Sequence, residues 1–244
     1  MLSKNKVKYI QTLCHKKQRL QENFFLAEGE KIISELLTQK KYTITELYAL
    51  PQWVAANKAL YKNIPITEIS LAELQKISNL TTPNKVLAIV ENYTDTEQPN
   101  SNTQLVLALD GIQDPGNMGT IIRLADWFGI QHILCSHTTV DWQMPKVIQA
   151  TMGSFIRVTI TYTNLANYIV TNNIVNVAIA TVHGTDIKKI EPLQNGIIIM
   201  GNEGNGISQS LTELATQQVS IVGKGNAESL NVAVATGIIL SHLV

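Results

Sequence analysis

The sequence contains no apolar run long enough to cross a membrane: within its 244 residues no stretch of about 18 consecutive apolar residues occurs. The lysine-rich N-terminus also lacks the apolar segment and the cleavage site of a secretory signal peptide. Both absences argue against an integral membrane protein and against a secreted one. We therefore expect a cytoplasmic protein.

Cysteine is equally scarce. The two cysteines, Cys14 and Cys135, lie far apart, without CxxC spacing and without a companion histidine pattern. Neither a disulfide framework nor a zinc site is expected from such an arrangement, and the sequence predicts no bound metal. Both residues are interpreted as reduced, half-buried thiols.

Net charge is lacking too, because 19 basic residues balance 19 acidic ones. Binding to nucleic acid normally requires a surplus of Lys and Arg. The distribution is uneven, however: residues 1–20 hold six basic residues and no acid, which leaves 13 basic against 19 acidic residues elsewhere. This basic segment is either a solvated helix face or a surface for RNA phosphates.

The N-terminal part is typical of a small α/β unit. Short apolar runs predict strands, and Gly29 interrupts the chain after the first of them. The predicted strands are 24–27, 44–50 and 86–90, and the helix after the first has an apolar face of Ile32, Ile33, Leu36 and Leu37.

Residues 91–103 are polar, contain Pro99 and show no periodicity, which is typical of a linker. We therefore predict two domains, one over residues 1–95 and one over residues 104–244.

Beyond this linker, fully apolar strands alternate with helical stretches. That alternation predicts a parallel sheet covered by helices on both faces, in which ligands bind at the carboxyl ends of the strands. The helix over 232–244 is apolar nearly all round, so it is expected to be buried. The predicted strands are 105–109, 133–135, 177–180, 197–200 and 219–222.

Three loops at these strand ends carry unusual polar and glycine content. The first, residues 110–119, reads DGIQDPGNMG and leads into a helix. Asn117 is a natural N-cap for that helix, and Arg123, about one turn further on, can reach over the strand ends. The alternative is an ordinary turn followed by a surface arginine.

The second loop, residues 201–207, reads GNEGNGI. Its three glycines allow a ligand to approach the backbone closely, although the pattern is neither the dinucleotide fingerprint nor a P-loop. Glu203 is a candidate general base or a structural acceptor for backbone N–H groups. The third loop, residues 223–231, reads GKGNAESLN, where Ser229 and Asn231 are either functional or simply residues that begin a helix.

Together, DxxQDPGNxGxxxRxA, MGNEGxGIS and SLNVAVATGI resemble the SpoU (TrmH-like) family of RNA 2'-O-ribose methyltransferases, within the trefoil-knotted superfamily. The likeness spans residues 104–244, with the motifs in the same order and at the same strand ends. Residues 146–154 are similar to the family's KxxxASxGA segment. The N-terminal KKQR, FFLAEG and Lys31 resemble the substrate-binding domain of many members, which is similar to the ribosomal L30e/L7Ae group.

This resemblance implies a fold and a cofactor. The fold is a deep trefoil knot in the C-terminal α/β domain. The cofactor is S-adenosylmethionine, bound in a bent form on the knot loops, and the family is homodimeric. The residues at the matching positions are Gly201, Ile221 and Leu230, whose main chains hold the adenine, and Thr181 to Gly184, which line the same pocket.

The resemblance also implies a catalytic set, which comprises Asn117, Arg123, Glu203, Ser229 and Asn231. Arg123 is expected to engage the substrate phosphate and to help activate the 2'-hydroxyl. A free arginine is a poor base, since its pKa exceeds about 12, so the group that accepts the proton is left open. Glu203 is assigned to shaping the loops.

RNA docking is assigned to the N-terminal domain, with Lys16, Lys17 and Arg19 contacting phosphates. The expected substrate is 23S-type ribosomal RNA, with transfer RNA as the alternative. Two rivals stay open: a non-catalytic RNA-binding ribosome-assembly protein with the same fold, and a knotted methyltransferase that acts on a base nitrogen.

Overall fold

The computed structural model describes residues 1–61, 63–93 and 99–244. Contacts between Cα atoms divide the chain into two units, the first comprising Met1–Asp95 and Asp141–Ile156 and the second Thr96–Val140 and Arg157–Val244. The segment Asp141–Ile156 therefore groups with the N-terminal unit, although the sequence places it well inside the second domain. Of the predicted linker, residues 94–98 lie outside the described residues.

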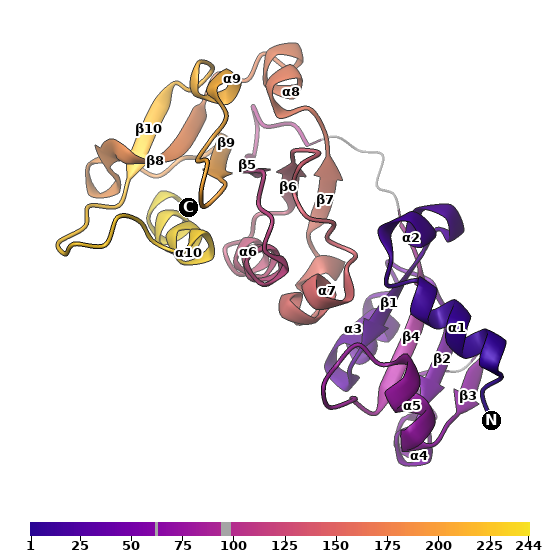
Figure 1. Ribbon diagram of the computed structural model, residues 1–244. Helices are drawn as coiled ribbons and strands as arrows, with labels where there is room; N and C mark the ends of the chain where they lie inside the picture. Colours follow the sequence, from indigo (N-terminus) through magenta and orange to yellow (C-terminus); the bar gives the residue numbers. More distant parts are fainter. Residues whose placement is uncertain (62, 94–98) are drawn as a thin grey trace. The chain divides into compact units, whose positions relative to one another are not determined.

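The first unit is built on a four-stranded sheet, labelled in Figure 1. Its strand order is β1-β4-β2-β3, with β4 antiparallel to both of its neighbours and β3 parallel to β2. The strands are β1 (Phe24–Glu28), β2 (Ile44–Ala49), β3 (Ile66–Glu68) and β4 (Val86–Glu91).

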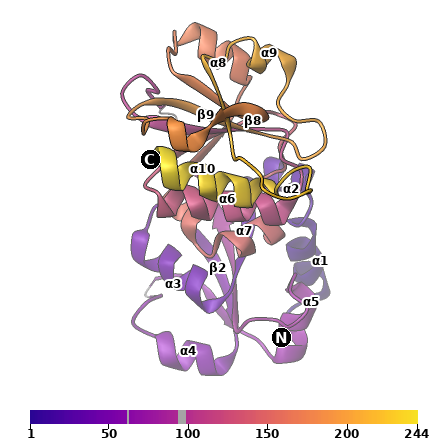
Figure 2. The ribbon, with the colours of Figure 1, turned by 90° about the vertical axis from the view of Figure 1, so that its left-hand side faces the viewer.

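Helices cover both faces of this sheet because residues alternate between its faces along each strand. Leu26 packs with Ile10 and Leu74 of helices α1 and α5 on one face. Phe25 points to the other, where α3 lies, and Figure 2 shows α3 on one side and α1 and α5 on the other. The helices are α1 (Lys4–Thr12), α2 (Lys16–Glu22), α3 (Glu30–Gln39), α4 (Pro51–Asn57), α5 (Leu71–Ile77) and α7 (Pro145–Thr151), with the 3-10 turn η1 (Ser154–Ile156).

The second unit is a six-stranded sheet in which every pairing is parallel. Its strand order is β10-β8-β9-β5-β6-β7. The predicted parallel-sheet α/β class is thus confirmed. The strands are β5 (Leu105–Asp110), β6 (His132–Cys135), β7 (Thr159–Tyr162), β8 (Val177–Asp186), β9 (Gly196–Gly201) and β10 (Gln217–Ser220).

Two helical layers enclose this sheet, as Figure 2 shows with α8 and α9 above it and α6 and α10 below. The apolar side chains of α8 and α9 pack on β5, β8 and β9, and α6 and α10 pack against one another. The helices are α6 (Pro115–Trp127), α8 (Leu165–Thr171), α9 (Gln209–Thr212) and α10 (Val232–Leu243), and η2 (Ile187–Lys189) is a 3-10 turn.

Three expectations need correction. The last strand ends at Ser220, so Ile221 and Val222 belong to the loop after it. Helix α10 is buried on one face only, and Val234 on the opposite face is 53% exposed. Cys135 is fully buried on β6, because it faces the core, whereas Cys14 is half-buried as expected.

In the part of the chain that the structure describes, no helix has the length and apolarity needed to cross a membrane. Within the same residues, no group of three His, Cys, Asp or Glu side chains is arranged to hold a metal ion. The trefoil knot stays a prediction from the family resemblance.

Candidate functional site

The first two motif loops are tied together where β5 and β9 end. These strands are parallel neighbours, with Asp110 in register with Gly201. The backbone N–H of Ser208 donates to Asp110 Oδ2 at 2.8 Å, and Asn202 Nδ2 donates to the carbonyl of Gly111 at 2.8 Å. One bond starts in the second loop and the other at the residue directly after it, and both end in the first loop, so the two loops are held together.

Asn202 also closes the second loop on itself. Its Oδ1 accepts the N–H groups of Gly204 and Asn205, each at 2.9 Å. Its backbone exchanges two bonds of 2.9 Å with Gly206, whose φ is +69°. A Cβ on Gly201 would lie 2.6 Å from the carbonyl carbon of Gly206. The loop's own packing therefore requires glycine at position 201, whatever ligand it binds.

Asn117 connects all three motif loops. Its Nδ2 donates to Glu203 Oε1 of the second loop at 2.5 Å. Its Oδ1 accepts a hydrogen bond from Asn231 Nδ2 of the third loop at 2.9 Å. Three of the five predicted catalytic residues are thus in direct contact, although 86 and 114 residues separate Asn117 from its partners in the chain.

The prediction that Asn117 is an N-cap is wrong. Asp114 caps α6, accepting the N–H of Asn117 on Oδ1 at 2.8 Å, and Pro115 occupies the first turn. Proline suits that position because its missing N–H would have no partner there. With the cap supplied by Asp114, the side chain of Asn117 is available to bind Glu203 and Asn231.

Asn231 is the N-cap of α10, and two backbone hydrogen bonds fix the orientation of its side chain. Its Oδ1 accepts the N–H groups of Ala233 at 3.0 Å and Val234 at 3.3 Å. Because the oxygen is held by the helix, the amide nitrogen must point away from it, toward Asn117. Capping therefore orients the contact between the first and third motifs.

The structure does not bring Arg123 and Ser229 into this contact. Arg123 is exposed on α6, six residues after Asn117 in the chain, which is about 9 Å along a helix axis. Ser229 is exposed in the loop before α10. Among the described residues neither side chain has a hydrogen-bond or ion-pair partner. Their polar groups are available for a ligand.

The predicted cofactor residues include a buried hydroxyl without a partner. Thr181 Oγ1 is buried, and no hydrogen-bond partner for it exists in the described chain. Thr181 belongs to the part of β8 where the pairing with β10 shifts register. Gly184, in the same part, cannot carry a Cβ, which would lie 2.7 Å from the backbone of Gln218. A buried hydroxyl without a partner is costly, so this site suits a ligand with a polar edge.

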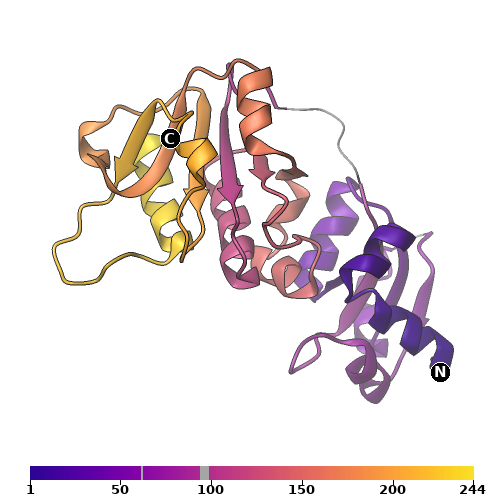
Figure 3. The same ribbon diagram turned by 45° about the horizontal axis from the view of Figure 1, so that its top comes forward.

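The loop between β10 and α10 contributes exposed apolar side chains, and Figure 3 shows it extending from the second unit. Val222 is 60% exposed and Leu230 48% exposed, and Ile221 lies at the start of the loop. Exposed apolar groups and a buried hydroxyl without a partner are the two kinds of group that a cofactor such as S-adenosylmethionine requires, since it has an apolar ring and polar edges.

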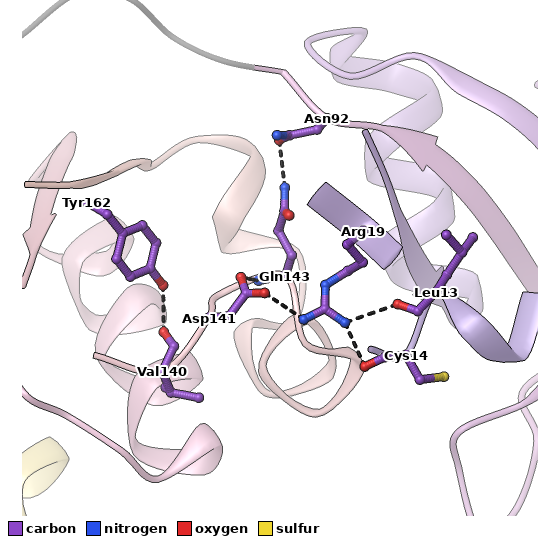
Figure 4. Close-up of polar contacts among 8 residues, drawn as sticks. All are labelled: Leu13, Cys14, Arg19, Asn92, Val140, Asp141, Gln143 and Tyr162. Carbon is purple, nitrogen blue, oxygen red and sulfur yellow. Dashed lines mark hydrogen bonds and ion pairs between the residues drawn. The ribbon is translucent and has the colours of Figure 1, made fainter. Parts of the chain in front are cut away.

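Of the predicted RNA-binding residues, Lys16 and Lys17 are exposed but Arg19 is not. The Arg19 guanidinium is buried and donates to the carbonyls of Leu13 at 3.0 Å and Cys14 at 2.7 Å (Figure 4). It also pairs with Asp141 at 2.5 Å. The prediction that Arg19 contacts phosphate is therefore wrong, because its charge is already neutralised inside the first unit.

Sequence reasoning missed Asn202 and Asp110 as organising residues. Both stand where an apolar strand ends, a position at which polar side chains face the loops of a parallel sheet. That signal was present in the sequence, but it does not show which loop each side chain would bind.

Two family descriptions match the chain. The SpoU rRNA Methylase family matches residues 104–241, and the MRM3-like substrate binding domain matches residues 4–88. A relative from Bacillus subtilis, the 23S rRNA (guanosine(2553)-2'-O)-methyltransferase, is 30% identical over 98% of this chain and 95% of its own length.

Solved structures agree with this result. A putative RNA methyltransferase of the TrmH family from Porphyromonas gingivalis has 34% identity and a TM-score of 0.87, over 100% of this chain and 98% of its own. An rRNA methyltransferase from Sinorhizobium meliloti with AdoMet bound has 30% identity and a TM-score of 0.86, over 100% of this chain and 96% of its own. With a matched family description, three assembled motifs and these similarities, the chain belongs to the SpoU rRNA methylase family.

Proposed function

We propose that this protein transfers the methyl group of S-adenosylmethionine to a ribose 2'-hydroxyl of ribosomal RNA. The observation that carries the proposal is the contact of Asn117 with both Glu203 and Asn231, which assembles the three motifs in one place. The relatives support it, since one is named for 2'-O-methylation of 23S rRNA and another binds AdoMet. A non-catalytic protein would have little need for this assembly.

S-adenosylmethionine supplies an electrophilic methyl group, whose bond to sulfur breaks as the bond to the ribose oxygen forms. The protein must hold that oxygen in line and help remove its proton. Arg123, exposed and without a partner in the described chain, binds the substrate phosphate and lowers the cost of the developing oxyanion. Asn117, Ser229 and Asn231 position the ribose, and Glu203 holds Asn117.

The cofactor is assigned to Thr181, Gly184, Gly201, Ile221 and Leu230. The hydroxyl of Thr181 gives a polar edge of the cofactor a hydrogen-bond partner that the described chain does not provide. Leu230 offers an exposed apolar surface for its ring.

The test is methyl transfer from labelled S-adenosylmethionine to ribosomal and transfer RNA transcribed without modifications, with the label mapped by nuclease digestion and mass spectrometry. We expect a 2'-O-methyl nucleotide in ribosomal RNA, lost in Arg123→Ala and kept in Lys189→Ala, which removes an exposed charge elsewhere on the second unit. Normal turnover by Arg123→Ala would refute its role. Absence of both transfer and cofactor binding would favour the non-catalytic alternative.

Ribosomal RNA is preferred over transfer RNA because the named relative that aligns over nearly the whole chain modifies 23S rRNA. A cytoplasmic location, where ribosomal RNA is available, is part of the same proposal. Label that appears in transfer RNA alone would overturn this choice.

The protein is proposed to act as a homodimer. Helices α6 and α10 pack together, yet each carries exposed apolar side chains, with Trp127 82% exposed and Val234 53% exposed. Tryptophan is enriched among residues that dominate interface energies. Sedimentation should give a dimer for the wild type and a monomer for Trp127→Glu, and a monomeric wild type would refute the proposal.

Lys16 and Lys17 are proposed to contact RNA phosphates from the exposed surface of α2. Each phosphate contact removed should lower the salt dependence of binding by about one unit of slope. The Lys16→Ala, Lys17→Ala double variant should therefore bind RNA with a shallower slope while cofactor binding is unchanged. An unchanged slope would refute this assignment.

A further inference from the structure

The first unit contains a pocket that the proposed catalytic set does not use. It has a volume of about 500 Å³, within the size range of ligand sites. Residues of β1, of the loop after α5 and of α7 line it together. The pocket therefore lies where the N-terminal sequence meets the segment Asp141–Ile156 inside one unit.

Its walls are largely apolar. Leu26 and Leu80 come from the N-terminal sequence, and Met144, Ala150 and Met152 come from α7 and its ends. Met152 is 41% exposed at the rim. Methionine side chains are flexible and polarisable, so they adapt to a flat ring.

A few polar groups converge on these walls, and several of them have unused bonding capacity. The side-chain amide of Gln149 has no hydrogen-bond partner among the described residues, and the exposed ammonium group of Lys146 has no ion-pair partner there. Asn79 accepts the Cys14 thiol on Oδ1 at 2.9 Å, which leaves its amide nitrogen to donate. Two amides and one cation are thus available to a ligand.

Glu28 differs from these groups because its carboxylate is already used. It accepts hydrogen bonds from Ser78 Oγ at 2.5 Å and from the N–H groups of Asn79 at 3.2 Å and Asn84 at 3.3 Å. These bonds hold the loop after α5 against β1. Glu28 therefore shapes the pocket and leaves recognition to Gln149, Asn79 and Lys146.

We propose that this pocket receives an unstacked nucleobase of the RNA substrate. The apolar walls enclose the ring, the amides of Gln149 and Asn79 bond its edge, and Lys146 contacts the adjoining phosphate. Proteins that recognise RNA by sequence commonly take unstacked bases into such contacts, and side-chain amides match the donor and acceptor pattern of base edges. This inference rests on the proposed function. It would identify the site that recognises a base of the RNA substrate.

The two cysteines allow a direct test on the native protein. Cys14 lines the pocket, whereas Cys135 is fully buried on β6 and serves as an internal control. Modification of Cys14 by a small disulfide reagent would be timed with and without unmodified 23S-type ribosomal RNA. We expect RNA at ten times its Kd to slow the reaction about tenfold, since about one pocket in eleven is then empty.

Variants separate pocket occupancy from binding elsewhere. The Lys146→Ala, Gln149→Ala double variant should need about tenfold more RNA for the same protection, as expected for losing contacts to one base. The matched control is Lys58→Ala, Gln75→Ala, which removes the same side-chain types from exposed positions of the first unit outside the pocket. This control should be protected like the wild type.

The outcomes distinguish this inference from the proposed function. RNA that binds and is methylated without slowing Cys14 modification overturns the pocket while leaving the methyltransferase intact. Equal protection in the pocket and control variants also overturns it. Protection by ribosomal proteins, but not by RNA, would assign the pocket to a protein partner and refute the inference.

Discussion

Arg19 and Asp141, 122 residues apart in the chain, form a buried ion pair with Nη2 and Oδ2 separated by 2.5 Å (Figure 4). Their side chains are 1% and 12% exposed. Nearby, Gln143 Nε2 donates to Asn92 Oδ1 at 2.6 Å. Both contacts attach the start of the segment Asp141–Ile156 to the N-terminal unit.

Removing Asp141 should destabilise the protein strongly, because Arg19 would be left as a buried charge without its counter-ion. We expect Asp141→Ala to lower the free energy of unfolding by about 3–5 kcal/mol in denaturant titrations. The control is Lys85→Ala, which breaks the exposed Lys85–Glu30 pair and should cost less than about 1 kcal/mol. Equal losses in the free energy of unfolding would show that the buried pair stabilises the protein no more than the exposed one.

The isolated fragment 1–95 should lack fixed tertiary structure. In the full chain, Phe25 packs edge-on against Trp142 and Phe155, with ring centroids 5.6 and 5.9 Å apart. Without these partners the aromatic side of the sheet is open to water. We expect weak near-ultraviolet circular dichroism from the fragment, partly restored by a synthetic peptide 141–156. A fragment as stable as the full protein would contradict this expectation.

The sequence predicted some strands and contacts of this fold and missed others. Strands β4, β5 and β9 were predicted because their sequences are apolar on both faces, and all but their end residues are buried. Strands β3 and β7 were missed, since they are short and only partly buried, which leaves little hydrophobic pattern. The burial of Arg19 was not predicted either, because its partner is distant in sequence and only the fold brings them together.

In the candidate site, too, the sequence selected some residues that lie together, and one prediction was wrong. Motif resemblance selected Asn117, Glu203 and Asn231, which the structure places in contact. The choice of helix cap went wrong because Asp114 and Asn117 both have suitable side chains, and the first-turn proline favours the earlier one. When two candidate N-cap residues lie within one helical turn, the local sequence does not reliably show which of them caps the helix.

Acidification should reveal the capping box of α5. Hydrogen bonds from the N–H groups of Ser70 and Leu2 hold the pKa of Glu73 down to about 2. A carboxyl group with a lowered pKa stabilises the fold above its ordinary pKa, and this contribution is lost as pH falls through the folded value. Glu73→Gln should therefore be less stable than the wild type at pH 7, and the difference should vanish as pH falls from 4.5 to about 2.

Glu68→Gln is the control for this titration, since Glu68 is exposed at the end of β3 and its carboxylate has no hydrogen bond within the described residues. Its stability should follow that of the wild type at every pH. A Glu73→Gln difference that is independent of pH would exclude the capping carboxylate as the cause.

Two glycines of the second motif loop should respond differently to alanine. A Cβ at position 201 meets Gly206 and Ile207 at 2.6 Å, whereas at position 204 the nearest atom is 3.5 Å away. Gly201→Ala should cost about 1–3 kcal/mol of stability and weaken cofactor binding in calorimetry, because the loop must move. Gly204→Ala should stay within about 0.5 kcal/mol of the wild type. Similar losses in both would mean that the loop is generally intolerant of side chains.

The contact between Asn117 and Asn231 predicts that their effects on catalysis are coupled. Asn117→Ala should lower kcat about 100-fold, since the ribose-positioning groups lose their common partner. Asn231→Asp retains the acceptor that caps α10 but has no proton to donate to Asn117 Oδ1. In a double-mutant cycle the two substitutions should show a coupling energy of about 0.5–3 kcal/mol in kcat.

The unfolding temperature of Asn231→Asp should stay near that of the wild type, which separates lost positioning from a lost cap. Additive effects would mean that the two residues act independently in catalysis, and that their hydrogen bond only supports the fold.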